Sequence, residues 1–513
     1  MPISTPHREY SAAAHQWLRC RDAYLGTDAI KARKRTYLPA LEGMTDEAQY
    51  ENYVLRALFY PATERTVSGL SGMIVRRPAV VTANDVVRDQ MSDVTLTGTS
   101  LDGYVLAAVQ EVLITGRCGT LVDMPPEATP ESRPYWVLYD AEDILNWAEA
   151  RNPVTGQMEL IALVLRETLW VPDPTDPYKS VATMQYRECR VANGIYTQTL
   201  WRPSASDKTQ FLREATYTPV RRGQPLTQIP FVFFGPRNIE ASVDKPPLLD
   251  LVDVNVSHYR TMADLEHGRH FTALPTPWVT GYSEVIGPDG KPGKLAIGAG
   301  TAWTMPDPQA KVGMLEFSGA GLKELREAAL HKEQLMAILG ARLLESQPRQ
   351  AETAEAVKMR HAGEAATLGS VVAALNEGFS RAVQWHAWWL AFEVDGQPDA
   401  EIRIDLNRDF FETQLDASTL ANLMAAWQGG AMSYETFFYN LQRGEIARPG
   451  VTAEEELKEI QEEQAEAQLL KQEVAEETAE ETEEEAEAEA EGVEPAEPGV
   501  TEQAESATEV APA

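Results

Sequence analysis

Residues 248–281 read LLDLVDVNVSHYRTMADLEHGRHFTALPTPWVTG, and this stretch decides the fold together with the segment that follows it. Its first part carries apolar side chains at steps of three and four, the spacing of one face of a helix. These are Leu248, Val252, Val256, Tyr259 and Met262. Prolines and glycines then exclude helix until about Phe317. They are Pro275, Pro277, Gly281, Gly287, Pro288, Gly290, Pro292 and Gly293.

Helical spacing returns twice after this extended insert. The second helix is marked by Leu322, Leu325, Ala329, Met336, Leu339 and Leu343. The third is marked by Leu368, Val372, Leu375, Phe379, Ala382, Trp389 and Leu390. Two helices that bracket an extended insert, followed by a longer helix, indicate a conduit and not a pocket.

The charge of the chain is concentrated at its C-terminal end. The 513 residues are enough for about three domains and carry a net charge of −33. Residues 452–513 contain 23 Glu, 2 Lys and no Asp or Arg, so they contribute −21 and leave −12 for the preceding 451 residues. A Glu/Ala composition cannot offset the entropy cost of ordering, which predicts a mostly disordered tail with a helix within Ala453–Val474.

The cysteines and the apolar runs indicate the cellular compartment in which the protein is expected. Cys20, Cys118 and Cys189 are odd in number and far apart, which argues against a disulfide framework and against a thiolate metal site. We find no secretion signal at the N-terminus, and the apolar face near Trp385–Phe392 is far shorter than the roughly 20 residues a bilayer requires. We therefore expect a protein of the reducing cytoplasm with no membrane partner.

The remaining chain alternates between helical and extended patterns. Ser11–Pro78 predicts two or three helices with a break at Pro61, and Ser100–Thr115 predicts another that ends at Gly116. Extended runs are expected at Gly119–Asp123, Tyr135–Tyr139, Leu160–Thr168, Ala182–Val191, Ile195–Arg202 and Ile229–Phe234. Asn193-Gly194 predicts a hairpin turn. Later elements are a long helix over Glu352–Phe392, a strand over Glu401–Leu406 and helices over Ala417–Trp427 and Ser433–Arg443.

The sequence contains no complete enzyme or metal-binding motif among those considered. Ile297-Gly298-Ala299-Gly300 lacks the third glycine of a dinucleotide fingerprint, and the chain has no phosphate-binding loop of the Walker type. His258, Glu266, His267 and His270 lack the spacing of a metal motif, so structural or surface histidines are the preferred interpretation. We predict no catalytic residue, no metal and no cofactor.

Basic residues gather at two places. Lys31, Arg33, Lys34 and Arg35 form the densest cluster, for which a solvated charged face is the preferred interpretation. The central region carries Lys291, Lys294, Lys311, Arg342 and Arg349. For this central set, a solvated face and a contact with a channel or a neighbouring subunit stay open.

The order of these elements and several local strings resemble the portal (head-to-tail connector) proteins of tailed bacteriophages. The strings are YVLRALFYPATERTVSGLSGMIVRRP at 53–78, PYWVLYDAEDILNW at 134–147, LTQIPFVFFG at 226–235, the segment 248–281 and residues 333–344. None is a catalytic motif, so the resemblance depends on their number and order, and it covers nearly everything before the tail.

The resemblance implies an α+β, mainly helical fold with an α/β wing, a two-helix stem, an extended clip and a helical crown. The parts would be the wing region at 1–245, the first stem helix at 246–271, the clip at 272–319 and the second stem helix at 320–339. A channel loop at 340–351, a long wing helix and strand at 352–414, a crown at 415–450 and the acidic tail at 451–513 would follow.

It also implies a function without an active site. Portal proteins form rings, typically of twelve subunits, at one capsid vertex, through which double-stranded DNA is packaged and ejected. The implied partners are other copies of the chain, the DNA, the terminase large subunit, the major capsid protein and head-tail adaptor proteins. The implied location is the virion, and the host cytoplasm during assembly.

Two other classes stay open. A minor head or scaffolding protein would account for the acidic helical tail but not for the long β-rich region. A head maturation enzyme would require a nucleophile or a carboxylate constellation, which the sequence does not display. For the tail, a solubilising appendage and a ring of negative charge that repels packaged DNA or docks a basic partner are both open.

Overall fold

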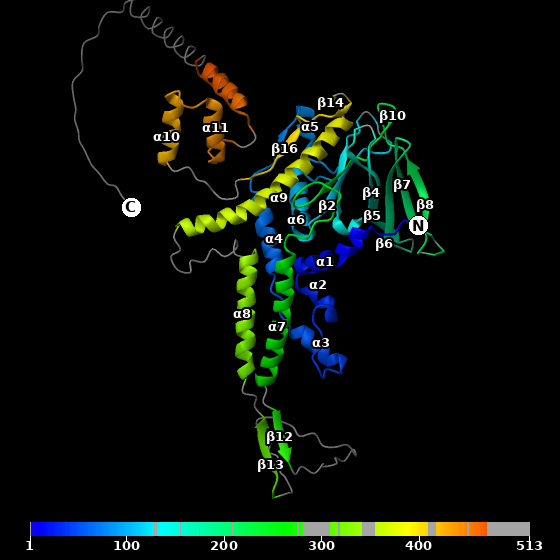
Figure 1. The fold of residues 1–513 in the computed structure, drawn as a ribbon, viewed down its shortest axis with the longest axis vertical. Helices are drawn as coiled ribbons and strands as arrows, with labels where there is room; N and C mark the ends of the chain where they lie inside the picture. Colours follow the sequence, from blue (N-terminus) through cyan, green and yellow to red (C-terminus); the bar gives the residue numbers. More distant parts are fainter. Residues whose placement is uncertain are drawn as a thin grey trace, which may run out of the picture. The chain divides into compact units, whose positions relative to one another are not determined.

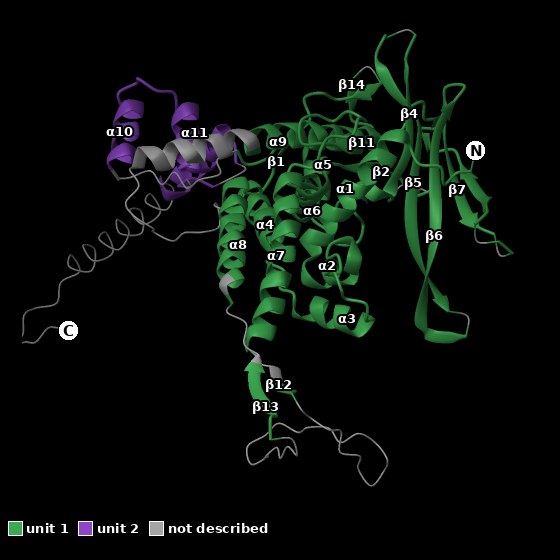
Figure 2. Cartoon of the chain, turned by 60° about the horizontal axis from the view of Figure 1, so that its bottom comes forward, with its two compact units in different colours: residues 1–412 green, residues 413–513 purple. Residues whose placement is uncertain are grey.

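The computed structural model describes residues 2–273, 276–280, 308–315, 319–340, 354–408 and 417–468, apart from positions 128, 130, 154, 174, 205, 208, 395, 445, 449 and 450. The side chains of 354–367 are not included. The chain divides into two compact units, Met1–Glu412 and Thr413–Ala513, which Figure 2 colours separately. Each unit is considered by itself.

The first unit begins with a group of helices (Figure 1). They are α1 (Arg8–Leu25), α2 (Thr27–Ala32), the 3-10 turn η1 (Lys34–Thr36), α3 (Glu47–Arg56), α4 (Ala62–Ile74), α5 (Asp85–Gln90) and α6 (Leu101–Thr115). The expected break at Pro61 is confirmed, but the expected two or three helices before residue 78 are four α-helices, because Gly26 adopts a positive φ of 86° and divides α1 from α2.

Helix α6 has both of its ends fixed by the sequence. The Ser100 side chain accepts a hydrogen bond from the Gly103 backbone N–H, and Gly116 ends the helix with φ 75° in the left-handed region, as predicted. The buried residues of α6 include Val105, Ala108, Val109 and Val112.

Two antiparallel sheets follow. The first has the strand order β11-β2-β3 and the second has the order β4-β5-β6-β7-β8. Their strands are β2 (Cys118–Asp123), β3 (Tyr135–Asp140), β4 (Ile144–Arg151), β5 (Met158–Asp173), β6 (Asp176–Ala192), β7 (Ile195–Pro203), β8 (Phe211–Tyr217) and β11 (Phe231–Phe234). Smaller pieces are η2 (Ala141–Asp143), β9 (Val220–Arg221) and β10 (Gln224–Pro225).

The predicted turn at Asn193-Gly194 is confirmed. Both residues have positive φ, 53° and 73°, and Ala192 pairs with Ile195 across a two-residue loop, as in a type I′ hairpin. Strands β4 and β8 were not predicted. Both carry exposed charged residues, and β4 also has register shifts in its pairing with β5, so neither shows a clean alternation.

The middle of the chain forms two helices and a hairpin. Helix α7 (Leu249–Ala273) and helix α8 (Ala320–Leu339) lie where the resemblance implies two helices, at 246–271 and 320–339. Between them, β12 (Thr276–Thr280) pairs antiparallel with β13 (Lys311–Leu315). The two helices lie side by side in Figure 1 and make extensive contacts.

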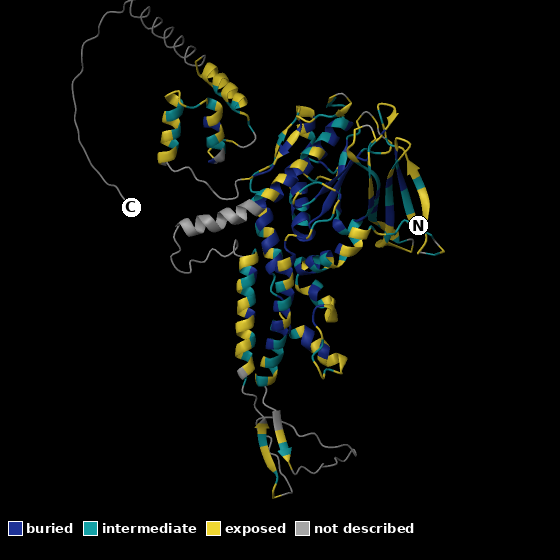
Figure 3. Ribbon diagram, viewed as in Figure 1, coloured by how far each residue is buried: buried dark blue, intermediate teal, exposed yellow. Residues whose placement is uncertain are grey.

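The long helix α9 (Ala354–Trp389) completes the first unit together with β14 (Glu393–Val394), β15 (Gln397–Pro398) and β16 (Arg403–Asp405). Helix α9 packs on β16, β11 and β2, and β16 pairs with β1 (Val80–Thr82). The N-terminal helices, the three-stranded sheet and α9 share one core, seen as dark blue segments in Figure 3. Its fully buried side chains include Tyr50, Tyr53, Trp136 and Phe379.

The second unit contains α10 (Ala417–Gln428), α11 (Tyr434–Arg443) and a helical segment at 453–468. The Trp427 and Phe437 rings stack with centroids 4.9 Å apart and join α10 to α11. The predicted helix at the start of the tail is confirmed over 453–468, and the prediction of disorder concerns residues outside the described ranges. None of the described helices combines the length and the apolar character needed to cross a bilayer.

The conformation of Gly116 generates a prediction about stability. A Cβ atom here would lie 3.1 Å from the Lys245 carbonyl oxygen, on a backbone whose φ is positive. We expect Gly116→Ala to lower the free energy of unfolding by about 1–2 kcal/mol.

Chemical denaturation of Gly116→Ala, of a control variant and of the native chain measures the free energy of unfolding. Gly72→Ala is the control, because Gly72 lies in α4 with nothing within 4 Å of its added Cβ, and it should leave stability unchanged or raise it. Equal unfolding midpoints for the two variants would contradict the assignment of Gly116 as a left-handed cap.

Candidate functional site

The candidate site consists of α7, α8 and the hairpin β12–β13. Helix α7 is the inner member of the helix pair, because it contacts α1, α3, α4 and α8. Its buried residues recur from the start of the helix to Leu265: Leu249, Leu251, Val252, Asn255, Val256, His258, Tyr259, Thr261, Ala263 and Leu265. Helix α8 is the outer member, since Ala329 and Met336 are its only buried side chains among those described.

Close packing joins the two helices near the hairpin end. A Cβ atom on Gly268 of α7 would lie 2.6 Å from Cδ2 of Leu322 on α8. Glycine is therefore the residue that allows Leu322 to reach the α7 backbone. Hydrogen bonds join the helices further along the pair. Lys332 Nζ of α8 donates to the Ser257 carbonyl oxygen (3.1 Å) and to Thr261 Oγ1 (2.6 Å) of α7.

The other end of the pair is anchored on α4. Met336 packs with Ala62 and Leu251 in a small buried cluster. Gly340, directly after α8, lies so close to α4 that an added Cβ would be 2.9 Å from Thr66 Cγ2. The helix pair is therefore fixed at the end away from the hairpin.

Polar side chains hold α7 to the N-terminal helices. Asn255 Nδ2 donates to the Tyr60 carbonyl oxygen (2.9 Å), and its Oδ1 accepts from Thr63 Oγ1 (3.0 Å). Arg260 Nε donates to the Tyr37 carbonyl oxygen at 2.7 Å, and the Tyr53 hydroxyl donates to Asp264. Burial raises the pKa of the Tyr53 hydroxyl, and its bond to Asp264 raises it further, so the hydroxyl keeps its proton.

The hairpin β12–β13 forms a two-stranded sheet by itself in the described part of the chain. The Trp278 indole covers Gly313, where an added Cβ would lie 2.8 Å from the ring. Trp278, Val312 and Met314 are 41%, 55% and 56% exposed. A lone two-stranded hairpin is at best marginally stable, so this apolar surface and these strand edges favour a partner.

Helix α8 also carries apolar side chains in solvent. Leu330, Ile338 and Leu339 are exposed. The helix pair contains five Lys and Arg residues and seven Asp and Glu residues, a net charge of −2. Its surface is therefore apolar in places and weakly acidic.

Of the five predicted contact residues, Lys311 alone lies in the part of the chain that the structure describes. Lys311 is exposed at the start of β13, opposite Thr280. Lys291, Lys294, Arg342 and Arg349 lie outside the described residues. Their role at a channel or clip stays a prediction.

The N-terminal basic cluster is engaged within the fold. Lys31 Nζ donates to the Leu55 carbonyl oxygen. Its neighbours form ion pairs: Arg33 with Asp22, Lys34 with Glu51, and Arg35 with Glu47. These contacts favour the structural interpretation of this cluster over binding of nucleic acid.

The four residues considered as metal ligands do not converge. His258 Nε2 lies 3.2 Å from Glu333 Oε1 and so links α7 to α8. Glu266 accepts from Arg269, and the His267 ring packs edge-on against Tyr53. Burial lowers the pKa of His258, in spite of the opposing effect of Glu333.

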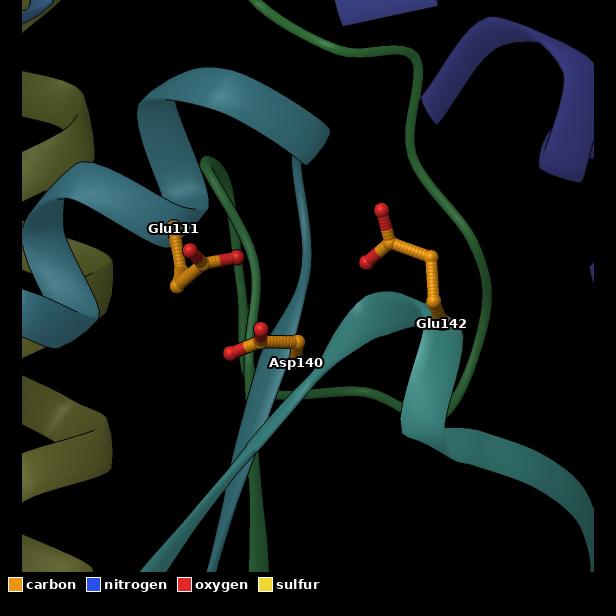
Figure 4. Close-up of side chains that lie close together, drawn as sticks. All are labelled: Glu111, Asp140 and Glu142. Carbon is orange, nitrogen blue, oxygen red and sulfur yellow. The ribbon is translucent and has the colours of Figure 1, made fainter. Parts of the chain in front are cut away.

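A carboxylate cluster that the sequence analysis missed lies elsewhere in the first unit. Glu111 on α6, Asp140 at the end of β3 and Glu142 in η2 lie close together (Figure 4). Arg21 of α1 reaches the cluster: its guanidinium donates to both Glu111 oxygens at 2.7 Å, and to Glu142 Oε1 at 2.9 Å and Oε2 at 2.7 Å. A guanidinium with this bidentate geometry supplies the positive charge that a metal would bring, so the cluster is a structural ion-pair network.

Residues 247–390, which span α7 to the end of α9, match a family model described as a domain of unknown function (DUF4055). No curated protein matches the chain.

Solved structures with a similar arrangement come from gene transfer agent (GTA) particles. A chain from the neck of the empty particle, computed with C6 symmetry, is 14% identical, with a TM-score of 0.37 over 79% of this chain and 95% of that one. A chain of the native GTA virion is 13% identical, with a TM-score of 0.37 over 80% and 98%. A chain from the native neck, computed with C12 symmetry, is 13% identical, with a TM-score of 0.32 over 74% and 89%. These scores are too low to carry an argument about function.

Asp140 generates a prediction about pH. Burial and the neighbouring Glu111 raise the pKa of the Asp140 carboxyl from 3.8 to about 7, against the opposing effect of Arg21. Between these values the folded chain holds a proton that the unfolded chain has released, so this group makes unfolding easier as pH rises. We expect Asp140→Asn to stabilise the fold at pH 8, and by less at pH 5.

Thermal unfolding at the two pH values measures this. Glu401→Gln is the control, because it removes one negative charge at an exposed position. If Asp140→Asn shifted the midpoint equally at pH 5 and pH 8, the assignment of a raised pKa to Asp140 would be wrong.

Proposed function

We propose that this chain is a structural portal-type protein of a phage-like particle, in which identical copies form a ring around a channel for double-stranded DNA. The observation that carries the proposal is the antiparallel pair α7–α8, closed at one end by an exposed hairpin and anchored at the other end on the N-terminal helices. The sequence resemblance to portal proteins, which includes the segment 248–281 that forms α7, also supports the proposal.

The dimensions of the pair suit a stem. Helix α7 has 25 residues and α8 has 20. At 1.5 Å per residue, they span about 38 Å and about 30 Å, enough to carry the chain through a protein shell and back. The polar ties of Lys332 and the close contact at Gly268 keep the two helices from separating along this length.

The hairpin suits a clip that a neighbouring copy completes. Its strands have free edges within the described residues, and its apolar side chains are exposed. An added strand from a second copy would satisfy the backbone groups of these edges and cover Trp278, Val312 and Met314. The exposed Leu330, Ile338 and Leu339 of α8 would contact the next copy in the same ring.

The charge of the stem suits passage of DNA. Tight DNA binding requires many neutralised phosphates, each of which steepens the salt dependence by about 0.9 log units. A helix pair with a net charge of −2 does not supply these cations. Lys311, with Lys291, Lys294, Arg342 and Arg349, would give a low density of positive charge at the clip and channel loop.

Further roles follow from the same proposal. The ring would have twelve subunits and would dock the terminase large subunit, the major capsid protein and head-tail adaptor proteins. It would be located in the virion, after assembly in the host cytoplasm, and would have no catalytic activity. The unit that contains α10 and α11 would be the crown, and the Glu-rich tail would repel DNA or dock a basic partner.

The hairpin provides the test of ring formation. We expect Val312→Asp to shift the chain from rings to monomers, because a carboxylate would be placed in the proposed contact between copies. Sedimentation velocity of the purified full chain measures the distribution. Val171→Asp is the matched control, since Val171 is an exposed valine of β5 on another two-stranded ribbon, and it should leave rings intact. Rings in both variants, or monomers for the native chain under all conditions, would refute the proposal.

The channel provides a second test. We expect assembled rings to bind double-stranded DNA more weakly than micromolar at about 0.15 M salt, because each subunit presents few cations. Fluorescence anisotropy with a labelled duplex over a range of salt concentrations measures this. Binding tighter than micromolar with a steep salt dependence would contradict a channel through which DNA slides.

A further inference from the structure

A cavity of about 410 Å³ lies where the two sheets of the first unit meet. Strand β2 ends there at Asp123 and β3 begins opposite it at Tyr135. Strands β7 and β8 contribute the paired residues Gln198 and Tyr217, and Trp389, the last residue of α9, lines another side. A cavity of this volume is in the range of sites that bind small ligands or inserted side chains.

The cavity has one carboxylate without a cationic partner. Asp123 is 4% exposed and lines the cavity. Its Oδ1 accepts from the Met124 backbone N–H at 2.9 Å and its Oδ2 accepts from Gln198 Nε2 at 2.9 Å. Both donors are neutral, and each oxygen keeps a lone pair free. Burial raises the pKa of this carboxyl, although its two hydrogen bonds and the nearby Arg187 oppose the shift.

The other charged residue of the lining is already engaged. Arg187 Nε donates to Glu167 Oε1 at 2.6 Å, and one terminal nitrogen donates to Gln198 Oε1 at 2.6 Å. Glu167 thus offsets the charge of Arg187. Asp123, Glu167 and Arg187 together have a net charge of −1, so the cavity is electrostatically suited to a cation.

The walls suit a cation carried on an apolar stem. Tyr135, Tyr217 and Trp389 supply aromatic rings, which attract ammonium and guanidinium groups through their faces. Leu200 and Pro219 supply apolar surface for methylene groups. Tyr217 and Val220 are exposed, so the rim is open to solvent.

We infer that this cavity binds a guanidinium or ammonium group on an aliphatic stem, as carried by an arginine or lysine side chain of a partner polypeptide, with Asp123 as its counter-ion. The cation would pair with the free lone pairs of Asp123 while its stem packs against the aromatic walls. The inference does not depend on ring formation, since every residue of the cavity comes from one subunit.

Isothermal titration calorimetry on the full chain at low salt tests the inference with three probes. They are a capped Gly-Arg-Gly tripeptide, the same tripeptide with citrulline, which is the neutral isostere of arginine, and spermidine. We expect the arginine peptide to bind at least about tenfold more tightly than the citrulline peptide, because a charge-assisted hydrogen bond contributes about 1.5–3 kcal/mol.

Two variants connect the binding to this cavity. Asp123→Asn should lose about tenfold or more of the affinity for the arginine peptide, whereas Glu127→Gln, with the same charge change on the adjoining exposed loop, should lose little. Tyr217→Ala at the partly exposed rim should also weaken binding, and it keeps the test valid if Asp123→Asn fails to fold.

The outcomes separate the sources of the cation. Tightest binding of the arginine peptide, lost in Asp123→Asn, supports a partner side chain. Tightest binding of spermidine, lost in the same variant, supports the cation site but overturns the partner polypeptide as its source. Equal binding of the arginine and citrulline peptides, no binding of any probe, or affinity unchanged in the Asp123 and Tyr217 variants would overturn the inference.

Discussion

The architecture depends on one constraint: the N-terminal helices pack against α7, so they cannot also cover α8. The N-terminal helices and α8 pack around α7 and bury side chains over most of its length, from Leu249 to Leu265. Helix α8 packs by a single stripe on α7, and the strands that connect the pair form a sheet of their own in the described part of the chain. The described residues of one chain therefore leave α8 and the hairpin incompletely covered, whereas a ring of copies could cover both, because each copy presents the same surfaces to its neighbours.

The rest of the first unit fixes the position of this pair. Asn255 and Arg260 tie α7 to backbone carbonyls of the N-terminal region, and Gly340 brings the end of α8 against α4. The N-terminal helices are in turn held to the sheets by the shared core and by Arg21, which joins α1 to Glu111 and Glu142. The half-buried ion pairs of Arg21 thus have a positioning role, because breaking one would leave a carboxylate in the fold without its cation.

The sequence predicted the elements whose signals are local. Apolar spacing and flanking glycines define α8, the left-handed Gly116 ends α6, and Asn193-Gly194 fixes the β6–β7 turn. Strands β4 and β8 were missed, because exposed charged residues interrupt their alternation. The carboxylate cluster around Arg21 and the cavity at Asp123 join residues far apart in the chain, so no local pattern could show them. Four of the five predicted contact residues lie outside the described ranges, and their roles stay predictions.

The most direct test of the account is a reconstruction of the purified full-length assembly in which individual strands can be traced. The account predicts a hollow ring in which β12 or β13 of each copy is hydrogen-bonded to a strand of the next copy, with α7 and α8 side by side along the channel. A closed globular particle, or a ring in which the hairpins point outward and contact no neighbouring copy, would contradict it.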